Sequence, residues 1–500
     1  MPKLKFPSAQ TILFIIAGLV AILTWLVPAG KYDSLMYDKG AKAFTRTSVD
    51  TSFTLPANQA TLDQLNIAIP LENFTSGDIY KPIGIPGTFT KVDSKPQGFL
   101  AFLKSPVKGI IATADIIFLV LIIGGLIGIM NRTGAFDAGM SWLANTLRGK
   151  EFMLIILTTT LVAFGGTTFG LAEETMAFFP ILIPIFLVAG YDALVAVACI
   201  FMGSAIGTMC STVNPFSTII ASDAAGVNWT TGFYGRVFML LLGTTICITY
   251  ILRYAAKVKK DPSASLIYSE KARIEKMFLS SEKKDASELK LTNKLRAILA
   301  VFILCFVVMI VGVSNLDWWF VEMTTTFLIG AIIIGFIARM KEEDFLESFI
   351  KGAGDLLGVA FIIGIARGVS ILMDDGVISD TMLYYASGLT EGMNKGVFVN
   401  VMFVIYAGLS FFVPSSSGMA VLTMPIMSPL ADTVGIGREI IVNTYQYGMG
   451  MFYFINPTGL ILASLAIVKV GFDKWLKFVW PLFLILVVTT MIVLTVSVYI

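Results

Sequence analysis

The chain of 500 residues contains no histidine. That absence removes the Ser-His and Cys-His pairs of nucleophilic catalysis, histidine-ligated haem and most catalytic zinc sites. Cysteine is scarce too, and its four copies lie in apolar stretches without metal-ligand spacing, at Cys199, Cys210, Cys247 and Cys305. Such cysteines are typical of packing residues. The sequence therefore lacks the commonest tools of an enzyme, and we expect no catalytic residues and no cofactor.

Charge is also scarce. Only 14% of the residues are charged, 56% are hydrophobic, and the mean hydropathy is +0.82. A soluble domain carries about a quarter charged residues, so this chain must bury much of its surface in lipid. The net charge of +2 argues against a nucleic-acid partner. These numbers predict an all-α polytopic membrane protein.

Apolar runs of about 20 residues are long enough to cross a bilayer as helices. About nine such runs are present, near 10–29, 110–131, 193–222, 234–252, 297–316, 318–338, 354–373, 438–468 and 478–499. Lys and Arg in the short loops concentrate on one side if the N-terminus is cytoplasmic. Nine spans then place the C-terminus outside.

Two further apolar segments, 152–190 and 397–432, are too long for one span and are broken by Gly, Ser and Pro. We interpret them as re-entrant hairpins. The expected organisation is then an anchor helix, an external cap loop, a first repeat, a charged cytoplasmic linker and a second repeat, over 1–30, 31–109, 110–256, 257–296 and 297–500.

The two halves repeat one another. Pro180, Pro184 and Gly190 recur with the same spacing as Pro425, Pro429 and Gly435. Other matches keep the same order: Asn214-Pro215 with Asn456-Pro457, Trp229 with Trp475, Gly134 with Gly376, and 99–109 with 345–352. In the predicted topology the copies are inverted, which is the architecture of alternating-access transporters. A plain duplication of helices is the alternative.

Asn-Pro interrupts the runs 193–222 and 438–468, because proline removes a backbone donor and pushes the preceding residue out of helical geometry. Two broken helices are therefore expected. Their free carbonyls and half-helix ends suit a cation or a substrate carboxylate. The candidate residues are Thr212, Asn214, Asn456 and Thr458. A simple proline kink, re-satisfied by Ser and Thr, is the alternative.

The hairpin tips carry small and hydroxylated residues, whose exposed backbone N–H groups suit a carboxylate. The candidates are Gly166, Thr167 and Thr168 in the first tip, and Ser415, Ser416 and Ser417 in the second. Small residues also let a hairpin pack closely, and the two interpretations are compatible.

Three charges lie inside apolar segments, where ionisable groups are expensive and usually functional. Glu173 and Glu174 follow the first tip, and Arg367 stands alone in its span. In the functional interpretation a glutamate takes a proton or a substrate cation while Arg367 holds a carboxylate. A structural ion pair between Arg367 and one glutamate is the alternative. Asn443 would add a donor to the pocket.

The segments FGGTTFGLAEETMAF, STVNPFS and VPSSSGMAVLTMPIMSPLADTVG resemble the YfcC-like branch of the anaerobic C4-dicarboxylate carrier family, within the ion transporter superfamily. The resemblance covers nearly the whole chain. It implies a bacterial inner-membrane homodimer in which a scaffold domain supports a transport domain that moves like an elevator. Members are assigned to C4-dicarboxylates and to arginine–ornithine exchange. The Ser-Asn-Thr tips of sodium–dicarboxylate relatives are absent here, which argues against sodium–dicarboxylate symport.

Two substrate hypotheses follow. Two carboxylates and one arginine complement a cationic or zwitterionic amino acid better than a dianion, so an amino-acid transporter leads. A C4-dicarboxylate carrier is the alternative, with a channel or an intramembrane enzyme behind it. The coupling ion stays open: Thr212, Asn214 and Asn456 suit Na+, Glu173 and Glu174 suit H+, and an exchanger needs neither.

Overall fold

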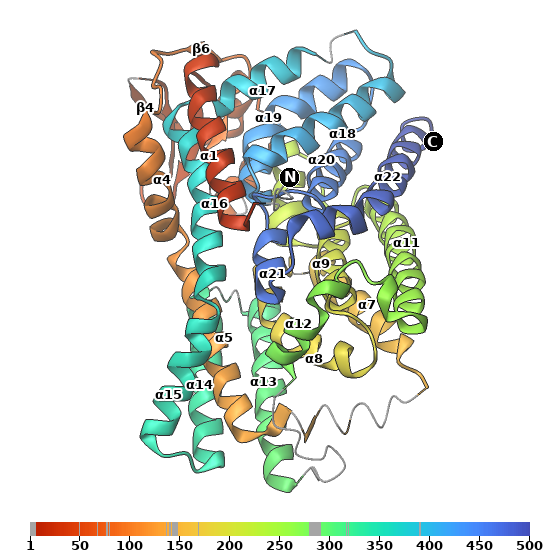
Figure 1. Ribbon diagram of the computed structural model, residues 1–500. Coiled ribbons are helices and arrows are strands. Elements are labelled where there is room, and N and C mark those ends of the chain that lie inside the picture. Colours follow the sequence, from red (N-terminus) through yellow and green to blue (C-terminus); the bar gives the residue numbers. More distant parts are fainter. Residues whose placement is uncertain are drawn as a thin grey trace.

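We describe the protein from a computed structural model. It describes residues 7–49, 51–67, 69–76, 79, 81–136, 138–139, 142, 149–168, 170–279, 292–316, 318, 320–389 and 392–500. The middle of the expected linker, 280–291, lies outside these residues. Helices run roughly parallel to the long axis of the molecule, and a small β-structure covers one end (Figure 1). We call this end the cap end, and the opposite end the linker end.

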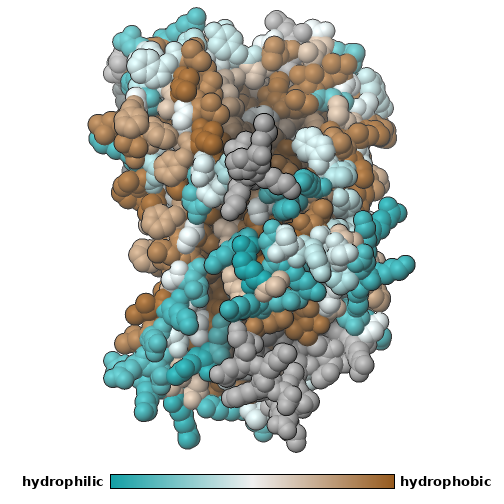
Figure 2. Space-filling view, in the orientation of Figure 1, coloured by the Kyte–Doolittle hydropathy of each residue, from teal (hydrophilic) through white to brown (hydrophobic). Residues whose placement is uncertain are grey.

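Among the described residues, seven helices are long and apolar enough to cross a membrane. Six coincide with expected spans: α1 (Ala9–Leu26), α5 (Ala114–Thr133), α11 (Phe233–Lys260), α14 (Phe320–Ala338), α16 (Leu357–Asp375) and α22 (Phe472–Ser497). The seventh is α18 (Lys395–Phe412), which we had assigned to the second hairpin. The expected span near 297–316 is α13 (Asn293–Asn315). Figure 2 shows hydrophobic residues over much of the flanks of this view and hydrophilic ones gathered at the lower front.

The segment expected as an external cap loop contains strands and short helices. It holds a two-stranded sheet, β1 (Gly30–Lys31) with β6 (Thr90–Lys91), and a four-stranded antiparallel sheet in the order β4-β3-β2-β5. The strands of the latter are β2 (Ser34–Asp38), β3 (Ala43–Thr47), β4 (Ser52–Pro56) and β5 (Ile83–Gly84), beside the short helices α2 (Gln59–Gln64) and α3 (Leu71–Ser76). Its own apolar core includes Leu35, Phe44 and Phe74. The helix α4 (Phe99–Ala112) then begins ten residues before the expected end of the loop.

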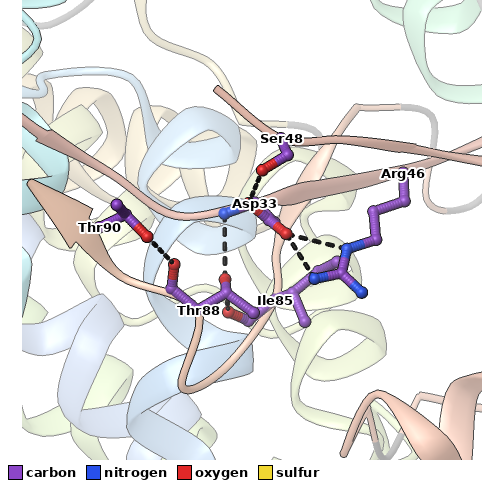
Figure 3. Close-up of polar contacts among 6 residues, drawn as sticks. All are labelled: Asp33, Arg46, Ser48, Ile85, Thr88 and Thr90. Atoms are coloured by element: carbon purple, nitrogen blue, oxygen red, sulfur yellow. Dashed lines mark hydrogen bonds and ion pairs between the residues drawn. The ribbon is translucent and has the colours of Figure 1, made fainter. Parts of the chain in front are cut away.

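An ion pair between the buried Asp33 and the half-buried Arg46 fastens this cap. The Asp33 side chain accepts hydrogen bonds from Arg46 Nε at 2.8 Å and from Ser48 Oγ at 2.8 Å (Figure 3). Its backbone N–H donates to Thr88 Oγ1 at 3.0 Å, and its carbonyl accepts the Ile85 N–H at 2.8 Å. Asp33 therefore ties β3 and the segment after β5 to the start of β2.

Two helix pairs form a long antiparallel unit on one side of the molecule (Figure 1). α4 continues into α5, and α15 (Glu342–Asp355) continues into α16; α4 packs on α16 and α5 packs on α15. A methyl group at Gly109 would collide with the Gly364 carbonyl oxygen, and one at Gly124 would stand 2.6 Å from the Gly352 carbonyl oxygen. Glycine thus permits these close backbone contacts.

The first repeat contains a helix–turn–helix and an interrupted helix. α7 (Phe152–Thr168) and α8 (Phe179–Val188) are joined through the 3-10 turn Glu173–Ala177. α9 (Ala193–Met209) ends before Asn214, and the chain resumes as the π-helical turn Pro215–Ile219 and α10 (Ile220–Ala225). The interruption expected at Asn214-Pro215 is therefore present.

The second repeat has the same order of elements. α18 is followed after three residues by α19 (Ser416–Thr433), then α20 (Arg438–Tyr453), a break at Asn456-Pro457, and α21 (Ile461–Val468). The short helix α17 (Ser379–Gly388) precedes α18 and packs on α19.

The two helix–turn–helix units open toward opposite ends. At the linker end, Ser265 Oγ donates to Asp192 Oδ2 at 2.6 Å, where α8 meets α9, and the linker helix α12 (Lys271–Phe278) packs on α8. At the cap end, Arg438 Nη1 donates to the Ala225 carbonyl oxygen at 2.9 Å, where α19 meets α20. This antiparallel relation supports inversion of the two repeats.

Candidate functional site

Asn214 joins the first broken helix to the first hairpin. Its Nδ2 donates to the Gly166 carbonyl oxygen at 3.3 Å, and its Oδ1 accepts the Phe216 N–H at 2.8 Å. Asn214 is buried. Gly170 has a φ of +79°, and a Cβ there would lie 2.9 Å from Asn214 Oδ1. The hairpin chain therefore passes the asparagine at a distance that only glycine allows.

Thr167 makes the second connection. Its Oγ1 donates to the Cys210 carbonyl oxygen at 2.8 Å and accepts the Thr212 N–H at 2.9 Å, while its carbonyl accepts the Val213 N–H at 3.2 Å. These bonds satisfy the backbone groups that the end of α9 leaves without helical partners. Thr168 is different, because its hydroxyl donates to the Phe164 carbonyl oxygen within α7 at 2.7 Å.

Asn456 repeats this arrangement in the second half. Its Nδ2 donates to the Ser410 carbonyl oxygen at 3.1 Å, and its Oδ1 accepts the Thr458 N–H at 3.0 Å and the Thr458 hydroxyl at 2.7 Å. Ser410 stands two residues before the end of α18, as Gly166 stands two residues before the end of α7. The sequence repeat therefore extends to individual hydrogen bonds.

The second hairpin tip is held by tyrosines of α20. Tyr453 donates its hydroxyl to the Pro414 carbonyl oxygen at 2.7 Å, and Tyr445 donates to that of Ser416 at 2.6 Å. Ser415 caps α19 by accepting the Gly418 N–H at 3.2 Å. Ser417 is buried and accepts a hydrogen bond from Lys81 Nζ at 2.8 Å. Lys81 comes from the cap, and our sequence analysis missed it because no sequence pattern connects residues 336 positions apart.

Glu173 and Glu174 lie in the 3-10 turn of the first hairpin, both half-buried. Glu174 Oε2 accepts the Ala172 N–H at 3.0 Å. The charge of Asp115, at the start of α5, acts on Glu173, and Glu173 in turn acts on the Tyr453 hydroxyl. The acidic group of the first hairpin is thus near the tyrosine that holds the second tip.

Arg367 makes no ion pair with either glutamate among the described residues, so the structure gives no support to that structural alternative. Its helix lies at the second tip instead, because Ser370, one turn further along α16, donates to the Phe412 carbonyl oxygen at 3.3 Å. The charge of Arg367 acts on Lys81 and on Asp374. Burial first, and the charge of Arg367 second, lower the pKa of Lys81. Two cations thus lie near the second tip.

Asn443, expected to add a donor to the pocket, contacts α11 in the structure. Its Oδ1 accepts a hydrogen bond from Arg236 Nη1 at 3.0 Å. Arg236 belongs to α11, is 0% exposed, and also donates to the carbonyl oxygens of Trp229 and Thr231. This burial could not be predicted, since Arg236 lies near a helix start, where an arginine is usually solvated. On the same face of α20, Gln446 Nε2 donates to Thr218 Oγ1 at 2.6 Å, next to the first helix break.

The described residues contain no group of three or more Cys, Asp or Glu side chains that could hold a metal ion. The arrangement offers a set of opposite charges: Asp115, Glu173 and Glu174 on the side of the first hairpin, and Lys81 and Arg367 near the second tip. Such a layout can hold a small molecule by charge at both ends.

Comparison with known proteins agrees with a transporter. The family model described as the C4-dicarboxylate anaerobic carrier matches residues 6–499. The chain is 44% identical over 499 residues to an uncharacterized protein of Haemophilus influenzae, covering 99% of this chain and 98% of that protein. It is 30% identical over 492 residues to YfcC of Escherichia coli K12, named as a candidate basic amino acid antiporter, covering 94% and 92%.

Two solved structures also align. The YdaH transporter of Alcanivorax borkumensis has a TM-score of 0.38 at 13% identity, covering 98% of each chain. MtrF of Neisseria gonorrhoeae has a TM-score of 0.40 at 15% identity, covering 99% of this chain and 96% of that one. The sequence matches, together with the apolar helices, show that the chain is a membrane transporter and belongs to the C4-dicarboxylate anaerobic carrier family.

Proposed function

We propose that the protein transports amino acids, cationic or zwitterionic, across the bacterial inner membrane, with arginine–ornithine exchange as the most specific form of the proposal. The observation that carries it is the separation of charge across Tyr453, with acidic groups on the side of the first hairpin and Lys81 and Arg367 at the second tip. An amino acid with a basic side chain has one carboxylate and two cationic groups, which matches this layout. The printed name of YfcC supports the same substrate class.

The transport mechanism we propose is alternating access. The two hairpins are re-entrant and ride with the broken helices on a moving domain, while the long pair of α4–α5 and α15–α16 serves as the scaffold of a homodimer. The opposed directions of the hairpins and the continuous, glycine-packed helix pair support this division. The linker end is cytoplasmic in this proposal, which puts the cap and the C-terminus outside.

The hydrogen bonds of the two asparagine oxygens bear on the choice of coupling ion. Asn456 Oδ1 already accepts two hydrogen bonds, which occupy both of its lone pairs, and Asn214 Oδ1 accepts one, which leaves a single lone pair for Na+. We therefore favour exchange, or H+ coupling through Glu173 or Glu174, over Na+ coupling through the asparagines and Thr212.

A C4-dicarboxylate remains the second candidate function, and the two cations at the second tip favour it. In that case Lys81 and Arg367 would take one carboxylate, and backbone N–H groups of a tip the other. Arg367→Gln should then cost far more affinity for a diacid than for a monoacid, whereas an amino-acid carrier should show no preference for the diacid in the wild type.

The test is uptake by purified protein in proteoliposomes, with labelled arginine and labelled succinate compared with and without internal substrate. Arginine uptake that needs internal arginine or ornithine, and that is indifferent to a Na+ gradient, is the expected result. Succinate uptake without an arginine signal would contradict the amino-acid proposal and favour the dicarboxylate.

A further inference from the structure

Resting on the proposed function, we propose that Lys81 of the cap joins Arg367 and Ser417 in a subsite that binds the carboxylate of a substrate arriving from the cap side. The cap then takes part in substrate recognition. The geometry that points to this subsite is the 2.8 Å contact of Lys81 Nζ with Ser417 Oγ in the first turn of α19.

The cap holds Lys81 in place. Lys81 stands two residues before β5, which pairs with β2 through Ser34 with Gly84 and Leu35 with Ile83. The Ile85 N–H donates to the carbonyl oxygen of Asp33. The side chain of Asp33 is in turn held by Arg46 and Ser48 (Figure 3). On its other side β5 packs on α19. The lysine is thus carried by a folded support that rests on the hairpin itself.

The electrostatics at this point favour an anion. Arg367 lies near enough for its charge to act on Lys81, so an anion placed between the two side chains would be attracted by both. The start of α19 adds the partial positive charge of a helix N-terminus. Asp374, on the same helix as Arg367, offsets part of that charge. A carboxylate bridging Lys81 and Arg367 would gain two charge-assisted hydrogen bonds.

Carboxylate is the chemical class that fits. Arginine side chains bind planar carboxylates through two parallel N–H groups, and a lysine adds a point charge. The neighbouring partner, Ser417 Oγ, is a neutral hydroxyl that can donate its own hydrogen to a carboxylate oxygen while it accepts from Lys81. The alternative is that Lys81 only fastens the cap to the hairpin.

The experiment measures binding rather than transport. Purified wild type, Lys81→Gln and Lys81→Arg are titrated with arginine and with argininamide, and with succinate and succinamide, and the rise in melting temperature gives each Kd. Lys91→Gln, an exposed lysine of β6 in the same cap, is the matched control. In the wild type the carboxylates should bind more tightly than their amides. Lys81→Gln should weaken carboxylate binding by about tenfold to a hundredfold, leave amide binding unchanged, and be largely restored by Lys81→Arg.

The outcomes separate the two proposals. Equal loss of carboxylate and amide binding, no loss at all, or no stabilisation of the wild type by any carboxylate would overturn the subsite. If Lys81→Gln is less stable than the wild type without ligand but still binds carboxylates more tightly than amides, Lys81 only fastens the cap to the hairpin. If the subsite behaves as expected while proteoliposomes exchange no amino acid, the proposed function fails and the subsite stands.

Discussion

The side-chain amides of Asn214 and Asn456 make the same two hydrogen bonds in the two halves of the chain. Each donates Nδ2 to a carbonyl two residues before the end of a hairpin's first helix, and each accepts the N–H two residues further along its own broken helix. An amide is required for this, because it supplies a donor and an acceptor from one planar group. The asparagines therefore lock each hairpin to its broken helix.

Replacement of either asparagine should disrupt the lock. Asn214→Ala and Asn456→Ala each remove a donor to a hairpin carbonyl and an acceptor for a backbone N–H, which costs about 1–3 kcal/mol of stability per site. We expect a lower melting temperature in detergent and loss of most transport. Asn228→Ala is the control, because Asn228 accepts the Thr230 N–H at 2.9 Å in the same way but is exposed and contacts no hairpin. Equal effects of all three substitutions would contradict the assignment.

Thr167 provides a second test of the contact between hairpin and helix. Thr167→Val keeps the shape of the side chain but removes the donor to Cys210 and the acceptor for Thr212. Transport should fall at least tenfold, with about 1–2 kcal/mol less stability. Thr245→Val, an exposed threonine of α11 that bonds only to Leu241 of its own helix, should transport normally. Normal transport by Thr167→Val would show that the hydroxyl is dispensable.

The contacts of the buried Arg236 predict an effect on stability alone. Its guanidinium holds Asn443 and two carbonyls at once, which the compact ammonium of lysine cannot do. Arg236→Lys should therefore lower the free energy of unfolding by about 1–3 kcal/mol. Arg253→Lys, on the exposed face of the same helix, should change it little. Thermal unfolding of the two variants measures this difference. Indistinguishable melting curves would show that the Arg236 guanidinium does not stabilise the fold.

The composition and the internal repeat suffice to predict much of this molecule. The membrane class and the broken helices at Asn214 and Asn456 follow from hydropathy and from the chemistry of Asn-Pro. The folded cap, Lys81 and Arg236 could not be predicted. Their contacts join residues far apart in the chain, and a single lysine in a polar segment or arginine at a helix start has no pattern of its own.

A pH dependence follows from Lys81, whose pKa is lowered by burial and by the charge of Arg367. A lysine with a lowered pKa loses its proton at a lower pH than a free lysine, and the neutral amine no longer attracts a carboxylate. The KM for external substrate should therefore rise as the pH is raised through this pKa. Lys81→Arg stays protonated and should remove that rise. An unchanged alkaline profile in Lys81→Arg would mean that another group is responsible.

In the proposed site, opposite charges hold the two ends of an amino acid. Competition against uptake of labelled arginine tests this most directly. Citrulline lacks the cationic side chain of arginine, and agmatine lacks its carboxylate, so both should inhibit the wild type poorly. We predict that in Glu173→Gln citrulline inhibits uptake as well as arginine does, while agmatine still inhibits poorly. In Arg367→Gln we predict that agmatine inhibits as well as arginine does, while citrulline still inhibits poorly. Weak inhibition by both compounds in both variants would contradict this assignment of charges.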